Sequence, residues 1–224
     1  MSTITTSLTD DRRRILQRRI RWIVTGTIAY NVLEAIIALT SGAAANSTAL
    51  IGFGLDSVVE ILSAAAIAWQ FAAPDPEKRE RAALRLISIS FFGVAAFVLV
   101  DAVLTLIGLK TPEHSPVGIG LAIASMLIMP GLSLLERRTG QELGSASAVA
   151  DSKQTLVCAA LSVAVLIGLV LNATLGWAWA DPVAGLVIVY FAVREGREAW
   201  GGETCTTPTS VLTGEQEGCG PGCC

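Results

Sequence analysis

Residues 54–63 read GLDSVVEILS and place two acids, Asp56 and Glu60, inside an apolar run that extends from 47 to 72. Such a run is long enough to cross the hydrocarbon core of a bilayer, which needs about 20 apolar residues. A charged side chain at that depth costs about 2.5–3.5 kcal/mol on insertion scales, so it generally faces a cavity or a partner. The stretch therefore predicts a membrane helix with a functional face.

The rest of the chain repeats the apolar pattern. Of its 224 residues, 52% are hydrophobic and only 16% are charged, whereas soluble domains average about a quarter charged. Apolar runs of spanning length occupy 23–40, 47–72, 86–109, 117–135, 148–171 and 176–192. They do not alternate over about ten residues as barrel strands would. The sequence predicts an all-α fold, a six-helix transmembrane bundle.

The basic residues predict the orientation of the bundle in the membrane. They collect before the first run, between the second and third, between the fourth and fifth, and after the sixth: Arg12, Arg13, Arg14, Arg18, Arg19, Arg21, Lys78, Arg79, Arg81, Arg85, Arg137, Arg138, Arg194 and Arg197. The loops on the other side contribute only Lys110. By the positive-inside rule both termini are cytoplasmic. Membrane orientation accounts for these charges, so they give no indication of nucleic-acid binding.

Three regions follow from this pattern. Residues 1–22 are expected to form a basic cytoplasmic segment, 23–200 the membrane bundle, and 201–224 a flexible cytoplasmic tail. The first twenty residues are polar and arginine-rich, which is not typical of a cleavable signal peptide. The first run is expected to act as an uncleaved signal-anchor.

Asp56 and Glu60 are four residues apart, so they project from one helical face about a turn apart. Two carboxylates in a poor dielectric repel each other, and the apolar runs contain no arginine that could neutralise them. They are therefore expected to be partly protonated when empty, or balanced by a divalent cation whose binding displaces protons. A neutral pair that only hydrogen-bonds between helices is the alternative.

The fifth run offers a complementary polar stripe. Asp151, Gln154, Thr155 and Cys158 follow the i, i+3, i+4, i+7 spacing of one helical face. Lys153 points away from this stripe and can reach the membrane interface. Cys158 is a candidate ligand because it shares the stripe, although a free cysteine is also a common small core residue.

Taken together, these residues resemble the cation diffusion facilitator family of divalent-metal efflux transporters, which have six transmembrane helices. The resemblance covers roughly 22–200 and implies a mid-membrane metal site built from i, i+4 pairs on the second and fifth helices. Residues 56–60, DSVVE, stand at the first pair, and residues 150–158, ADSKQTLVC, resemble the fifth-helix motif. Residues 180–185, ADPVAG, resemble the family's sixth-helix start, and residues 31–34, NVLE, resemble its short members.

The resemblance implies four metal ligands: Asp56, Glu60, Gln154 and Cys158. Glu34, Asp151 and Asn31 are implied as accessory metal or proton sites. Compared with the family pattern, Glu60 replaces an aspartate, and Gln154 and Cys158 replace a His–Asp pair. This anionic set with one soft donor suits zinc, with cadmium, cobalt, manganese and ferrous iron as alternatives.

The end of the chain also departs from the family. A typical member carries a cytoplasmic metal-binding domain after the sixth helix, but the residues after Trp200 are too few for an independent fold. A homodimer is therefore expected to use membrane helices, with Gly52 and Gly54 permitting close contact. The tail instead carries four cysteines, which either capture a soft ion or are incidental thiols: Cys205, Cys219, Cys223 and Cys224.

The resulting hypothesis is a metal exporter, not an enzyme, in the inner (plasma) membrane of a bacterium. The expected partners are the lipid bilayer, divalent metal ions carried as cargo, most of all zinc, and protons moving inward by antiport. Asp101 and Asp181 are expected to be structural or gating residues. Two alternatives stay open, a non-transporting metal sensor or accessory protein and a proton-coupled carrier of organic cations.

Overall fold

The structure is a computed structural model that describes residues 10–71, 76–143 and 146–201. Within those ranges all regular structure is α-helical, in six helices: α1 (Asp10–Ala44), α2 (Thr48–Phe71), α3 (Pro76–Leu106), α4 (Pro116–Leu143), α5 (Ala146–Leu175) and α6 (Ala180–Gly201). The predicted all-α bundle of six helices is confirmed.

Several helices continue beyond the apolar runs at the end that carries the arginines. α1 begins at Asp10, well before its apolar run, and α4 continues to Leu143. Arginine and glutamate have good helix propensity, so the polar flanks extend the helix instead of ending it. α3 begins at Pro76, a residue whose fixed φ and missing N–H suit the first helical position.

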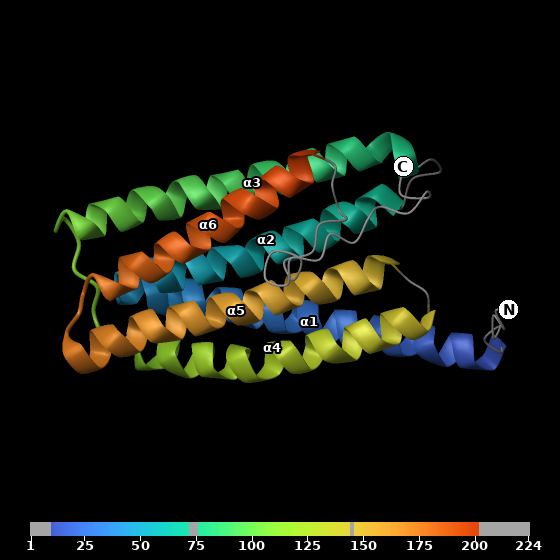
Figure 1. The fold of residues 1–224 in the computed structure, drawn as a ribbon, viewed down its shortest axis with the longest axis horizontal. Coiled ribbons are helices and arrows are strands. Elements are labelled where there is room, and N and C mark those ends of the chain that lie inside the picture. Colours follow the sequence, from blue (N-terminus) through green and yellow to red (C-terminus); the bar gives the residue numbers. More distant parts are fainter. Residues whose placement is uncertain (1–9, 72–75, 144–145, 202–224) are drawn as a thin grey trace, which may run out of the picture.

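The helices are arranged with α2 at the centre. α3 packs along α6, α4 packs along α5, and α1 contacts α2 and α4 (Figure 1). α2 contacts α1, α3, α5 and α6. The helix with the two predicted acids therefore lies inside the bundle, where its polar face can meet other helices.

The bundle has the character of a multi-pass membrane protein. Among the described residues, α1 to α5 each contain a segment long and apolar enough to cross a membrane. α6 is less uniformly apolar because Asp181 lies in its first turn and four charged residues lie between 194 and 198. Large apolar side chains such as Leu127 and Ile107 are exposed on the outside of the bundle, as expected of a surface that faces lipid.

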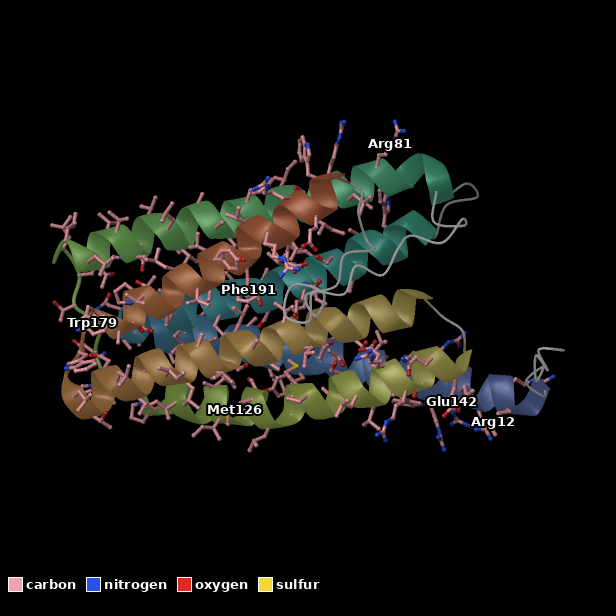
Figure 2. The ribbon with its side chains drawn as sticks, viewed as in Figure 1. Arg12, Arg81, Met126, Glu142, Trp179 and Phe191 are labelled. Carbon is pink, nitrogen blue, oxygen red and sulfur yellow. The ribbon has the colours of Figure 1, made fainter. Side chains whose placement is uncertain are left out.

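The two ends of the bundle differ in composition. At one end, here called the arginine-rich end, Arg12 forms an ion pair with Glu142 at 3.2 Å (Figure 2). At the other end Trp177 stacks on Trp179 with ring centroids 5.3 Å apart. The start of α1 and the end of α6 both lie toward the arginine-rich end (Figure 1). The positive-inside rule assigns that end to the cytoplasm.

At the tryptophan end, two buried acids fasten α2 to its neighbours. Asp181 of α6 accepts hydrogen bonds from Ser47 Oγ at 2.5 Å and from the Thr48 amide at 2.7 Å. Asp101 of α3 accepts a hydrogen bond from Thr48 Oγ1 at 2.7 Å and forms an ion pair with Lys110. Asp181 thus satisfies backbone donors at the start of α2. Both acids therefore hold α2 to its neighbours, which is compatible with either the structural or the gating role expected for them.

Two glycines of α2 are used within the protomer. A Cβ at Gly52 would lie 3.0 Å from Ile188 Cδ1 of α6, and one at Gly54 would lie 3.0 Å from Ala38 Cβ of α1. Both positions are buried inside the bundle. The expectation that Gly52 and Gly54 serve contact between two copies is therefore wrong, because they already bring α2 close to α6 and α1.

We predict that Gly54→Ala destabilises the bundle. The added Cβ would lie 2.9 Å from Leu39 Cγ as well as against Ala38, and overpacking of this kind typically costs about 1–3 kcal/mol. Thermal unfolding of the purified protein in one detergent measures the effect. Gly93→Ala is the matched control, because its Cβ meets no atom within 4 Å. Equal melting temperatures for the two variants would contradict the packing argument.

Candidate metal centre

Three predicted ligands meet between α2 and α5. One carboxylate oxygen each from Asp56 and Glu60 and the Cys158 sulfur all lie within 4.8 Å of one another. The side chains of Asp56, Glu60 and Cys158 are 6%, 9% and 0% exposed. The two acids reach the same place because i and i+4 positions share a helical face. We call these three residues the acid–thiol cluster.

The separation of these atoms suits a metal ion. In a tetrahedral zinc site with bonds of about 2.0–2.3 Å, neighbouring ligand atoms lie roughly 3.3–3.8 Å apart. The acid–thiol cluster, with its atoms within 4.8 Å, needs only small side-chain rotations to reach that geometry. Two carboxylates and a thiolate would supply three ligands of a four-coordinate site.

The acid–thiol cluster lies at mid-depth in the bundle. Glu60 is near the middle of α2, and Cys158 is near the middle of α5. Each of these helices contains a segment able to cross a membrane. Membrane transporters commonly bind substrate ions near the bilayer midplane, and this location agrees with that arrangement.

Asn31 of α1 borders the acid–thiol cluster. It is 4% exposed, and its Nδ2 donates a hydrogen bond to Glu60 Oε2 at 2.5 Å. Its Oδ1 is buried and has no hydrogen-bond partner among the described residues. An amide oxygen is an acceptor and a possible metal donor. Asn31 therefore orients one oxygen of Glu60 and leaves a second acceptor atom beside it.

Glu34 of α1 lies in a network next to the same cluster. Its Oε2 accepts hydrogen bonds from Ser57 Oγ at 2.7 Å and from the Cys158 thiol at 3.8 Å. Its Oε1 accepts a hydrogen bond from Ser125 Oγ of α4. Ser125 in turn is 2.7 Å from the Tyr30 hydroxyl. Because Glu34 is fully buried, these contacts join α1 to α2, α4 and α5 through a single carboxyl group.

The remaining predicted residues are not part of the acid–thiol cluster or lie outside the residues that the structure describes. Gln154 is half-buried, one helical turn from Cys158 toward the arginine-rich end. The side chain of Asp151 lies outside the described residues. So do the four tail cysteines: Cys205, Cys219, Cys223 and Cys224.

Two network members, Ser57 and Ser125, were not predicted from the sequence. Each also bonds a backbone carbonyl of its own helix, Ser57 that of Phe53 and Ser125 that of Leu121. Serine commonly satisfies itself in this way, so a serine in an apolar run gives no signal of its own. Ala122, Ser125 and Met129 of α4 are all fully buried, and their spacing of three and four residues puts them on one helical face. This inward face of α4 is known only from the structure.

We predict that Glu34→Ala strongly destabilises the bundle, because it leaves buried donors on Ser57 and Ser125 without their acceptor. The expected loss is about 2–4 kcal/mol, and Glu34→Gln loses less because its amide oxygen still accepts. Chemical or thermal unfolding in detergent measures the change. The neighbouring Leu33→Ala is the control, since Leu33 is 60% exposed. A Glu34→Ala protein as stable as Leu33→Ala would contradict the network's structural role.

Comparison with known proteins agrees with this architecture. Residues 24–199 match the family model described as the cation efflux transmembrane domain. Transmembrane protein 163 of Xenopus laevis is 24% identical over 154 residues, which are 67% of this chain and 55% of that protein. The chain thus spans about half the length of this curated relative. Since the family match covers most of the sequence and all of the acid–thiol cluster, the chain belongs to the cation diffusion facilitator family of membrane transporters.

Proposed function

We propose that the protein exports a divalent metal cation, zinc before others, from the cytoplasm in exchange for protons. The observation that carries this proposal is the acid–thiol cluster, where Asp56, Glu60 and Cys158 converge within 4.8 Å at mid-depth. Two carboxyl groups and a thiol that converge in this way form an anionic donor set when deprotonated, and a bound divalent cation would offset their charge.

The donor set supports zinc as the cargo and is also compatible with other divalent metals. Zinc accepts carboxylate, thiolate and imidazole ligands in a tetrahedron. The fourth donor is proposed to be an amide oxygen, from Asn31 on α1 or from Gln154 on α5. Cysteine favours soft ions such as cadmium, whereas manganese, cobalt and ferrous iron rely more on the carboxylates.

Proton exchange follows from the ligand chemistry. A cysteine binds metal as a thiolate and carboxylic acids bind as carboxylates, so loading the site releases protons. The Cys158 thiol donates a hydrogen bond to Glu34, and this is a proton that metal binding through the sulfur would release. A pH gradient directed into the cell returns protons to the emptied site and thereby drives export. Glu34 and Asp151 are the accessory groups we propose for this exchange.

Transport also requires access to the site from each side in turn. The Cys158, Asp56 and Glu60 side chains are 0%, 6% and 9% exposed, so an ion held there would be largely buried inside the bundle. At the tryptophan end, Thr48 bonds both Asp101 and Asp181 and thereby holds α2 to α3 and α6. We propose that helix groups rock around the acid–thiol cluster and that these contacts loosen when the outer side opens.

We predict that Asp56→Ala abolishes zinc uptake into everted membrane vesicles. Removing one of two carboxylates from the site lowers metal affinity by at least roughly tenfold and removes a proton-exchanging group. A zinc indicator trapped inside the vesicles, with an imposed pH gradient, measures the rate. Glu142→Gln is the control, because Glu142 is exposed and lies at the arginine-rich end.

Other outcomes of the same assay would identify the alternatives. Uptake by Asp56→Ala at the wild-type rate contradicts the proposed site. A wild-type protein that binds zinc but moves none would be a metal sensor or an accessory protein. Uptake of an organic cation that zinc does not inhibit would identify a carrier of such compounds.

We predict that Cys158→Ser changes metal preference. Loss of the only sulfur among the clustered donors lowers cadmium affinity by about tenfold or more and manganese affinity much less. Competition with a chromophoric chelator measures both affinities in the purified protein. Ala159→Ser introduces a hydroxyl at the adjacent buried position and leaves the cadmium affinity unchanged. Equal losses for cadmium and manganese would exclude Cys158 as a selective ligand.

A further inference from the structure

A groove separates α1 from α4 at the arginine-rich end of the bundle, far from the acid–thiol cluster. It has a volume of about 570 Å³ and is lined on the α1 side by Arg18, Arg19 and Trp22. Leu135 contributes to the α4 side. The Arg12–Glu142 ion pair also joins α1 to α4 near this end (Figure 2). We call this feature the α1–α4 groove.

The charge of the α1–α4 groove is positive and unbalanced. No acidic residue lines it, and neither Arg18 nor Arg19 forms an ion pair within the described part of the chain. A second groove, on α6, differs in this respect because its Arg194 pairs with Glu198 at 2.8 Å. The α6 groove also contains Arg197, so the α1–α4 groove, with two arginines and no acidic lining residue, is the more positive of the two.

The groove also has an apolar lining. Ile15, Trp22 and Leu135 are 55%, 67% and 56% exposed, and Ile23 lies beside them. A site for a small anion alone has no need of such a surface. Arginines beside exposed aromatic and aliphatic side chains match a ligand with an anionic head and apolar chains.

The depth of these residues in the membrane agrees with the same kind of ligand. Asn31 of α1 bonds Glu60, which lies at mid-depth. At a rise of about 1.5 Å per residue, Arg18 lies roughly 20 Å from that level and Trp22 roughly 14 Å. The hydrocarbon half-thickness is about 15 Å. Arg18 and Arg19 thus reach the headgroup layer, and Trp22 lies at its boundary with the acyl chains.

We propose that the α1–α4 groove binds an anionic glycerophospholipid of the cytoplasmic leaflet. The lipid phosphate pairs with Arg18 and Arg19, since guanidinium groups bind phosphate in a forked geometry. The acyl chains lie along Ile23 and Leu135. Because the bound lipid contacts both helices, it holds α1 against α4, and α1 carries both Asn31 and Glu34. This site is independent of the metal that the protein carries.

The test uses the full-length protein purified in a neutral detergent without added metal. Phosphatidylglycerol is added to one sample, and phosphatidylcholine with the same acyl chains to another. Phosphatidylglycerol in about tenfold excess over its dissociation constant is expected to raise the melting temperature by roughly 3–6 °C. Phosphatidylcholine is expected to raise it by much less. Inorganic phosphate at the same concentration is expected to have no effect, since it cannot fill the apolar part of the groove.

The double variant Arg18→Gln/Arg19→Gln is expected to lose the shift. Arg81→Gln/Arg85→Gln is the matched control, since it also removes two positive charges, from α3, with Arg81 at the same end of the bundle (Figure 2), and it is expected to keep the shift. An undiminished shift in the double variant, an equal shift with phosphatidylcholine, or an equal shift with phosphate would overturn the proposal.

A further variant covers the case in which the double variant does not fold. Arg19→Lys keeps the charge and is expected to reduce the shift, because lysine cannot make the forked contact. A shift equal to that of the wild type in Arg19→Lys would then overturn the role of the arginine pair. Since no step of the test involves metal transport, its outcome is separate from that of the export assays.

Discussion

The high cost of an unpartnered carboxyl group inside a membrane organises this bundle. Water is absent at that depth, so a buried acid requires hydrogen-bond donors, a cation or a proton. Glu34 meets this requirement with hydroxyls from two neighbouring helices and a thiol from a third. The polar contacts that satisfy it also fix how α1, α2, α4 and α5 pack. In this protein, the polar contacts at mid-depth add to the packing of a buried apolar core that includes Phe53 and Met129.

Four of the buried acids of the bundle fall into two groups that differ in their partners. Asp181 bonds backbone and hydroxyl donors at the start of α2, and Asp101 has a lysine and a threonine. Asp56 and Glu60 instead converge with a thiol, an arrangement that brings acidic groups together. The repulsion between such groups when charged is relieved by a proton or by a bound cation. Amino-acid composition does not distinguish these four acids. Their contacts in the structure do, because Asp101 and Asp181 bond the start of α2 whereas Asp56 and Glu60 converge with a thiol.

Much of this organisation could be predicted from the sequence. The six apolar runs anticipated six helices, because a bilayer imposes a length and a hydropathy on each span. The i, i+4 spacing of Asp56 and Glu60 correctly put them on one inward face. The serine contacts of Glu34 could not be predicted, since they depend on how α1 and α4 are rotated in the bundle. The same is true of Gly54, because a glycine in an apolar run does not reveal whether it faces its own helices or another copy.

The position of α1 gives this helix a particular relation to the acid–thiol cluster. It contributes none of the three clustered side chains, yet Asn31 bonds Glu60 and Glu34 accepts from Cys158. The Cys158 sulfur is one of the clustered atoms, and Glu60 contributes one of its two carboxylate oxygens. Binding through Glu60 Oε2 would displace the Asn31 amide hydrogen or turn its oxygen toward the ion, and binding through the sulfur would remove the thiol proton from the Glu34 contact. If an ion binds the Cys158 sulfur as proposed, the Glu34 contact loses its proton, so a bound ion would alter at least one contact of α1, a helix that supplies none of the three clustered side chains.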